Sequence, residues 1–181
     1  MIGFDPIVGP EPRVLVLGTA PSERSLREGR YYAHPRNDFW PIMERLFADG
    51  RPLEYTDRVQ MLKDAGVGLW DVLTAAERVG SLDATITAPV ANDLGGFLQD
   101  HPSIGTVFFN GATAERLFQA HCASGLARSD MRFVRLPSTS PAHASVSFTL
   151  KLAAWQAVRA AAGEGQAPPS NAAPAPRPLP D

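Results

Sequence analysis

Residues 31–40 hold more side chains capable of chemistry than a protein core needs. The segment is Tyr31-Tyr-Ala-His-Pro-Arg-Asn-Asp-Phe-Trp40. Flat aromatic rings stack on nucleic-acid bases, and an Asn amide can both donate to and accept from a base edge. The alternative is that Phe39 and Trp40 simply begin a core helix, and we adopt it for Trp40 alone. The segment as a whole predicts a pocket for a base.

Two further segments follow predicted strands. Residues 18–26 combine small residues with hydroxyls, which lets backbone amides approach a phosphate. They lack the lysine of a Walker loop and the glycine spacing of a dinucleotide fingerprint, so an ordinary strand-to-helix turn stays open. Residues 136–143 form a hydroxyl-rich loop that two prolines stiffen. Such a loop can present hydroxyls and amides to a DNA backbone, or it can be a plain connector.

These segments need a scaffold, and the hydrophobic pattern predicts one. Short apolar runs, each read as a buried strand, lie at residues 13–17, 67–73, 106–110 and 132–136. Strands separated by helices indicate βαβ units and a parallel sheet covered on both faces. We therefore predict an α/β fold, a three-layer α/β/α sandwich with a central four-stranded parallel sheet. Ligands bind at the carboxyl ends of such strands.

Helices are predicted between the strands from capping residues and apolar spacing. The last one carries Phe148, Leu152, Trp155 and Val158 on one face. The others are expected after Asn37 or Asp38 through Phe47, after Thr56 or Asp57 through Leu62, after Asn92 or Asp93 through Leu98, and from Thr113 through Phe118.

Composition narrows the class of protein. The chain has 181 residues, 44 % of them hydrophobic, a net charge of −2 and one cysteine, Cys122. This balance argues against bulk electrostatic capture of nucleic acid. Without a disulfide framework, a signal-like start or an apolar run of roughly 20 residues, we expect a cytoplasmic protein with no membrane contact. We also expect a monomer with one domain, residues 1–162, and a disordered Pro/Ala-rich tail, residues 163–181.

No metal or other cofactor is predicted. The four histidines show no ligand spacing with Cys122; they are His34, His101, His121 and His143. His34 is either a proton donor near neutral pH or the cap of the turn before Pro35, and we prefer the turn. Asp71, inside an apparently buried strand, is left out of the catalytic set.

Taken together, the segments resemble the uracil-DNA glycosylase superfamily, and most closely its hypoxanthine-DNA (deoxyinosine) glycosylase branch. The resemblance covers residues 10–160 and is carried by residues 18–22, 31–40, 69–72, 80–83, 108–111 and 136–142. It implies a monofunctional glycosylase that hydrolyses the N-glycosidic bond of hypoxanthine, and by extension of uracil or xanthine, in single- or double-stranded damaged DNA. Such an enzyme begins base excision repair.

The resemblance also implies roles for individual residues. Asn37 matches the asparagine regarded as catalytic in the hypoxanthine branch, and Tyr32 matches the aromatic residue on which a flipped base stacks. With Tyr32, the residues assigned to the base are Phe39, Gly18, Thr19 and Asn110. Those assigned to DNA are Pro21, Ser22, Arg36, Ser138, Thr139, Ser140, Pro141 and His143.

The sequence departs from the superfamily pattern in the first motif, where the usual Gly-Ser-Met/Phe-Pro-Gly reads Gly18-Thr-Ala-Pro-Ser22, and at three single positions. Thr19 stands where uracil-excising relatives have Asn or Asp, and Ser138 where the classical uracil enzymes have His. His143 stands where the hypoxanthine branch has Asn. The alternatives are a uracil-DNA glycosylase, a lesion-binding protein without activity, and, most remotely, a nucleotide-binding α/β protein. A lyase step through a Schiff base is not expected, because the three segments lack lysine.

Overall fold

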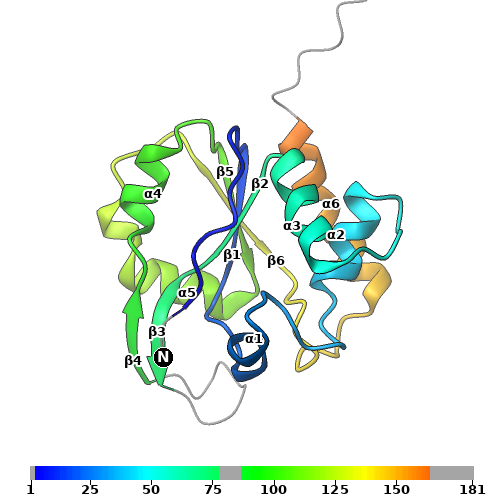
Figure 1. Cartoon of the computed structure of the whole chain (residues 1–181). Helices are drawn as coiled ribbons and strands as arrows, with labels where there is room; N and C mark the ends of the chain where they lie inside the picture. The colour runs from blue at the N-terminus through cyan, green and yellow to red at the C-terminus, as the bar shows by residue number, and fades with distance from the viewer. Residues whose placement is uncertain (1–2, 78–86, 164–181) are drawn as a thin grey trace, which may run out of the picture.

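The computed structural model describes residues 3–77 and 87–163, and they form three layers (Figure 1). The central sheet has four parallel strands in the order β2-β1-β5-β6. They are β1 (Val14–Gly18), β2 (Val67–Asp71), β5 (Thr106–Asn110) and β6 (Arg132–Leu136). The predicted fold class is confirmed.

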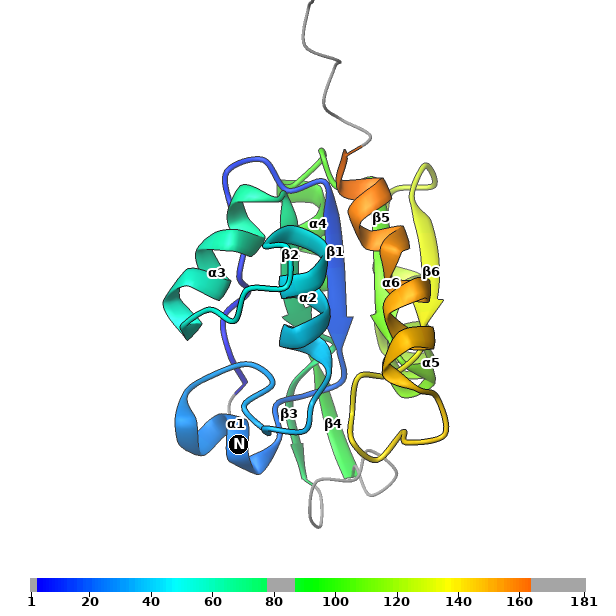
Figure 2. The same ribbon diagram turned by 90° about the vertical axis from the view of Figure 1, so that its right-hand side faces the viewer.

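Helices cover both faces of the sheet, as Figures 1 and 2 show. On one face lie α2 (Phe39–Phe47), α3 (Tyr55–Asp64) and α6 (Phe148–Gly163). On the other lie α4 (Leu94–Asp100) and α5 (Ala112–His121), which is followed by the 3₁₀ turn η2 (Ala123–Gly125). The short helix α1 (Glu23–Glu28) follows β1 at the carboxyl edge of the sheet.

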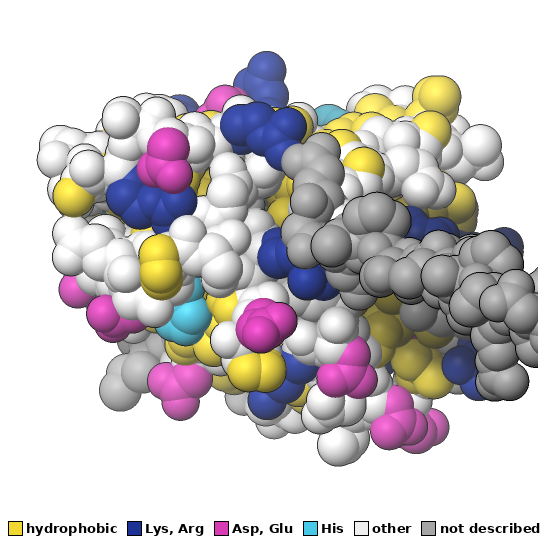
Figure 3. Space-filling view, turned by 90° about the horizontal axis from the view of Figure 1, so that it is seen from above, with side chains coloured by type: hydrophobic (Ala, Val, Ile, Leu, Met, Phe, Trp, Pro, Cys, Tyr) yellow, Lys and Arg dark blue, Asp and Glu magenta, His cyan; other side chains and the backbone are white. Residues whose placement is uncertain are grey.

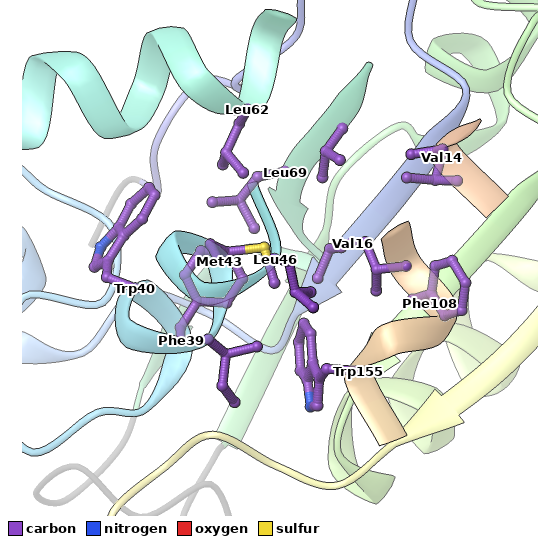
Figure 4. Packing of buried hydrophobic residues seen from close by; sticks show 14 of the residues in the cluster. Val14, Val16, Phe39, Trp40, Met43, Leu46, Leu62, Leu69, Phe108 and Trp155 are labelled. Carbon is purple, nitrogen blue, oxygen red and sulfur yellow. The ribbon is translucent and has the colours of Figure 1, made fainter. Parts of the chain in front are cut away.

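The alternation of side chains along β1 divides the core into two clusters. Val14 and Val16 pack with α2, α3 and α6, where Phe39 and Trp155 are fully buried (Figure 4). Leu15 and Leu17 pack with α4 and α5 on the opposite face. All of β1 is buried because both faces of the strand are covered.

The prediction for residues 67–73 was wrong at its end. The strand stops at Asp71, although the Val72 and Leu73 amides still donate to the carbonyls of Gly18 and Thr19 and hold the chain beside the end of β1. It continues as β3 (Leu73–Glu77), which pairs antiparallel with β4 (Thr87–Ala91). This two-stranded sheet was not predicted, because neither strand has a run of large apolar residues.

Helix starts were predicted with mixed success. Asp93 caps α4 as expected, its carboxylate accepting from the Gly96 amide at 2.9 Å. The start of α3 was wrong, because the helix begins at Tyr55 after Glu54 rather than after Thr56 or Asp57. The start of α5 at Thr113 was also wrong: Gly111, at φ 97°, makes the turn and the helix begins at Ala112. The sequence interpretation did not predict α1.

Several further expectations concern the chain as a whole. Among the described helices, none is both long and apolar enough to cross a membrane. Within residues 3–77 and 87–163, no group of three or more His, Cys, Asp or Glu side chains could hold a metal ion. Cys122 is buried, and burial raises the pKa of its thiol. Both properties are those of a residue that packs in the core. Residues 80–83 and 164–181, the latter being most of the predicted tail, lie outside the described residues.

Candidate active site

A pocket of about 130 Å³ opens where the four parallel strands end. Gly18 ends β1, Asp71 ends β2, Asn110 ends β5, and the loop of residues 137–141 follows β6. The two central strands, β1 and β5, are adjacent. The connection from β1 leads outward to β2 at one edge of the sheet, and the connection from β5 leads outward to β6 at the other edge. The pocket therefore lies at a topological switch point, where open α/β sheets bind ligands. Figure 3 shows the opposite end of the molecule, where acidic and basic side chains are interspersed.

Most residues that the sequence assigned to base or DNA line this pocket. They are Gly18, Thr19, Pro21, Ser22, Tyr32, Asn37, Asn110, Ser138, Thr139, Ser140 and Pro141. Three assigned residues lie elsewhere. Phe39 is fully buried behind Tyr32, and Arg36 is exposed outside the pocket. His143, also exposed, lines a neighbouring hollow beyond Ser138 and Ser140.

Asp71 is a pocket residue that sequence reasoning left out. Its side chain is buried, and its Cα pairs with Gly18 in the register of β1 and β2. A Cβ on Gly18 would lie 2.3 Å from Asp71 Oδ1 and 2.8 Å from Tyr32 Oη. Gly18 is therefore required because the carboxylate and the phenol meet over its Cα. The strand register was the available signal, but the overlong predicted strand placed Asp71 in its interior.

Tyr32 is held in an unusual conformation by its neighbours. Its φ of 51° lies in the left-handed region, which costs a residue with a Cβ roughly 1–3 kcal/mol. The ring stacks on Phe39 with centroids 4.2 Å apart, and the Tyr32 hydroxyl accepts a hydrogen bond from Asn110 Nδ2 at 3.0 Å. Because Phe39 occupies one face, a base can stack only on the opposite face of Tyr32.

The Asn110 amide connects the walls of the pocket. Besides donating to Tyr32, its Nδ2 donates to Thr139 Oγ1 at 2.9 Å, and its Oδ1 accepts from the Thr139 amide at 2.9 Å. Both hydrogens of the NH₂ group are thereby used within the protein. Asn110 therefore holds Tyr32 and the loop in place and has no N–H left to offer to a base.

Asn37 is differently engaged. Its Oδ1 accepts from the Phe39 amide at 3.0 Å, and because a backbone N–H can only donate, this contact fixes the orientation of the side-chain amide. The NH₂ group makes no hydrogen bond within the described residues, and the side chain lines the pocket. Asn37 therefore offers the pocket two N–H donors.

His34 forms the turn that leads to Asn37. Its Nδ1 accepts from the Arg36 amide at 3.1 Å, and its carbonyl accepts from the Asn37 amide at 2.9 Å. This is the turn-capping role preferred from the sequence. His34 also lines the pocket, and with Nδ1 as acceptor the neutral ring carries its proton on Nε2.

The loop after β6 uses its hydroxyls to hold its own shape. Ser138 Oγ accepts from the Ser140 amide, and Ser140 Oγ accepts from the Ala142 amide, both at 3.2 Å. These local turns leave each hydroxyl hydrogen able to donate to a ligand. Thr139 is fully buried, so it supports the wall rather than the mouth.

Arginines near the pocket mouth are partly neutralised. Arg24, which lines the pocket, contacts Glu28 at 2.7 Å, and Arg30 contacts the same carboxylate at 2.6 Å. Hydrogen bonding from Arg24 lowers the pKa of Glu28, with a smaller contribution from Arg30. On the buried side of the pocket, desolvation and, to a lesser degree, the charge of Asp71 raise the pKa of Tyr31.

The chain is similar to known proteins over most of its length. The family model of the Uracil DNA glycosylase superfamily matches residues 6–159. A protein of Methanosarcina barkeri named hypoxanthine DNA glycosylase is 34 % identical over 110 residues, which is 60 % of this chain and 70 % of that protein. A protein of the same name from Methanosarcina acetivorans is 34 % identical over 113 residues, 62 % of this chain and 72 % of that protein.

A solved structure is similar as well. It is the solution NMR structure of a Methanosarcina acetivorans protein described as a candidate uracil DNA glycosylase, with a TM-score of 0.73 and 30 % sequence identity. The match covers 87 % of this chain and 95 % of that chain.

Proposed function

Because the chain belongs to the uracil-DNA glycosylase superfamily and is a DNA glycosylase, we propose that it removes hypoxanthine from DNA by hydrolysing the N-glycosidic bond. The names of the two Methanosarcina relatives support this choice of base. The observation that carries the proposal within this chain is the Asn37 amide. Its acceptor is bound to the Phe39 amide, its NH₂ group makes no hydrogen bond in the described part of the chain, and the residue lines the pocket.

Burial supports one orientation of the base. Gly18, Asp71 and Asn110 at the strand ends are buried, whereas His34 and Asn37 are partly exposed. A nucleotide flipped out of DNA enters from the exposed side and remains attached through its sugar. The base edge farthest from the sugar then faces Asp71, and one face of the base stacks on the Tyr32 ring. The glycosidic bond stays near Asn37.

The carboxylate of Asp71 fits the edge that deamination creates. Hypoxanthine carries a hydrogen on N1 beside its carbonyl oxygen, whereas adenine has an unprotonated acceptor at that position. A carboxylate accepts a hydrogen bond from the former and repels the latter. Uracil offers the same pattern of N–H beside a carbonyl. Guanine and thymine offer it too, so this contact distinguishes hypoxanthine and uracil only from adenine and cytosine, the bases from which deamination forms them.

Catalysis in this proposal depends on charge that develops on the departing base. As the glycosidic bond breaks, negative charge moves onto the base, and the N–H donors of Asn37 strengthen their hydrogen bonds to it. Loss of one such preorganised donor costs about 10²–10³ in rate. Among the described residues no lysine lines the pocket, which supports hydrolysis by water without a Schiff base.

The proposal includes a monomer acting without a cofactor on single- or double-stranded DNA. The test uses labelled oligonucleotides that carry one inosine or one uracil, single-stranded and in duplex, with alkaline cleavage of abasic sites. Fastest release from inosine is expected, with an adenine-containing duplex as the undamaged control.

Two other results would each select a different reading. Faster release of uracil would make this a uracil-DNA glycosylase. Tight binding to the inosine duplex with no strand cleavage after alkali would make it a lesion-binding protein, and the two donors of Asn37 would then serve recognition alone.

A further inference from the structure

Helix α6 fastens both loops of the pocket from behind. Lys151, whose side chain is 3 % exposed, places its Nζ 2.7 Å from Asp38 Oδ2, next to Asn37. One turn further along the helix, Trp155 Nε1 donates to the Pro137 carbonyl at 3.0 Å. The Asp38 amide also donates to the Thr139 carbonyl at 3.0 Å, which joins the two loops directly.

Asp38 is used in an unexpected way. It occupies the position just before α2, where an Asp side chain usually accepts from the first free amides of the helix. Its carboxylate makes no such bond and is directed to Lys151 instead. Because the desolvation of the buried Lys151 ammonium offsets most or all of its attraction to the partly exposed Asp38 carboxylate, stability alone gives little reason for this pair.

We propose that Lys151 is a positioning residue for the Asn37 amide, an inference that rests on the proposed function. Asp38 is held through its amide by Thr139 and through its carboxylate by Lys151. Asn37 precedes it directly, so the pair fixes where the Asn37 donors lie. Lys151 does not line the pocket and so acts only through Asp38. Misplacement of a reacting group by 1 Å can cost about 10²-fold in rate.

The test replaces Lys151 with a side chain of similar length and no charge, Lys151→Met. Single-turnover release of hypoxanthine at saturating enzyme is expected to slow by about 10- to 100-fold. The enzyme concentration giving half the maximal rate should change by less than about twofold, because no DNA contact is lost. Thermal unfolding should change little, since Met keeps the buried apolar stem of Lys151 and the freed Asp38 carboxylate, whose side chain is 28 % exposed, stays in contact with water.

Arg159→Met is the matched control, because Arg159 is exposed on the same helix and its loss changes the net charge equally. It should keep the wild-type rate. A second variant, Asp38→Asn with Lys151→Met, leaves no unpaired charge and keeps the test available should the single variant fail to fold. It too should excise slowly while unfolding near the wild-type temperature.

The inference is overturned if the folded Lys151→Met variant, or the double variant, releases hypoxanthine at the wild-type rate. It is also overturned if the loss of rate merely follows the fraction of unfolded protein. The proposed function fails separately: an Asn37→Asp variant that excises normally refutes the catalytic amide whatever Lys151 does. An inactive Asn37→Asp beside an unimpaired Lys151→Met refutes only the positioning role.

Discussion

Replacement of Asn37 by Asp separates a structural role from a catalytic one at a single atom. The Oδ1 of Asn37 accepts from the Phe39 amide at 3.0 Å, and an Asp oxygen at the same place can accept that bond. The change removes only the two N–H donors, because an ionised carboxylate has acceptors alone. The local turn is preserved, while the side chain presents hydrogen-bond acceptors to the pocket where it had presented donors.

The expected magnitudes differ widely for rate and stability. A donor to a developing negative charge is worth about 2.7–4 kcal/mol, so Asn37→Asp should slow base release by about 10²–10³. Folding stability should rise slightly or stay the same, since a carboxylate near a helix N-terminus gains about 0.3–1 kcal/mol. In a domain of this size, that is a rise of roughly 1–4 °C in Tm at most.

The assay measures single-turnover release of hypoxanthine and thermal unfolding on the same preparations. Asn37→Ala should lose the rate as well and also unfold earlier, because the bond to Phe39, worth about 0.5–1.5 kcal/mol, is gone. Gln99→Glu makes the same amide-to-carboxylate change at an exposed position on α4, across the sheet. That control should match the wild type in rate.

One result would refute the reasoning. If Asn37→Asp releases hypoxanthine at nearly the wild-type rate, Asn37 serves only to form the turn. The catalytic assignment must then move to another polar residue of the pocket, such as Thr19, His34 or Ser138.

Three further predictions follow from the site. Gly18→Ala should abolish activity and lower the free energy of unfolding by about 1–3 kcal/mol, because the new Cβ would lie 2.3 Å from Asp71 Oδ1. Gly105→Ala is the control: its Cβ would meet nothing within 4 Å, so activity and melting temperature should stay unchanged. DNA affinity should fall with salt at a log–log slope of about −2, since Arg27 and Arg36 are exposed and without an ion pair in the described part of the chain and each neutralised phosphate contributes about −0.9; a flat titration would place the DNA elsewhere. Base release should persist in EDTA, and activity that returned only on adding zinc or magnesium would contradict it.

The sheet and the gathering of the site could be predicted from the sequence because both depend on strong local patterns. Four apolar runs predicted the four strands, and the rule that ligands bind at the carboxyl ends of parallel strands brought residues 18–22 and 138–141 together. Residues 31–37, which follow a helix, were added to the site from their side-chain chemistry and from the resemblance. The β3–β4 sheet was not predicted because neither strand has an apolar run that marks it in the sequence. Its two strands are recognised only by their pairing with each other.

The division of labour inside the site could not be predicted from residue types. Asn110 and Asn37 look alike in sequence, yet one amide is consumed by Tyr32 and Thr139 while the other keeps its donors. Phe39 was assigned to the base but supports Tyr32 from behind, and Asp71 was read as strand interior but reaches the pocket. Such assignments depend on hydrogen-bond partners and register, which tertiary structure alone decides.

The convergence of all four strand ends on one pocket has a consequence for how activity appears during folding. The walls come from residues as distant in the sequence as Gly18 and Pro141, and β1 pairs with β5 across about ninety intervening residues. Such distant pairings close slowly and only when most of the domain is in place. A chain still emerging from the ribosome, or opened at one edge of the sheet, has no pocket into which a base can turn. Glycosylase activity is therefore a reporter of the completed fold, and a partly folded chain leaves the damaged base attached to its sugar.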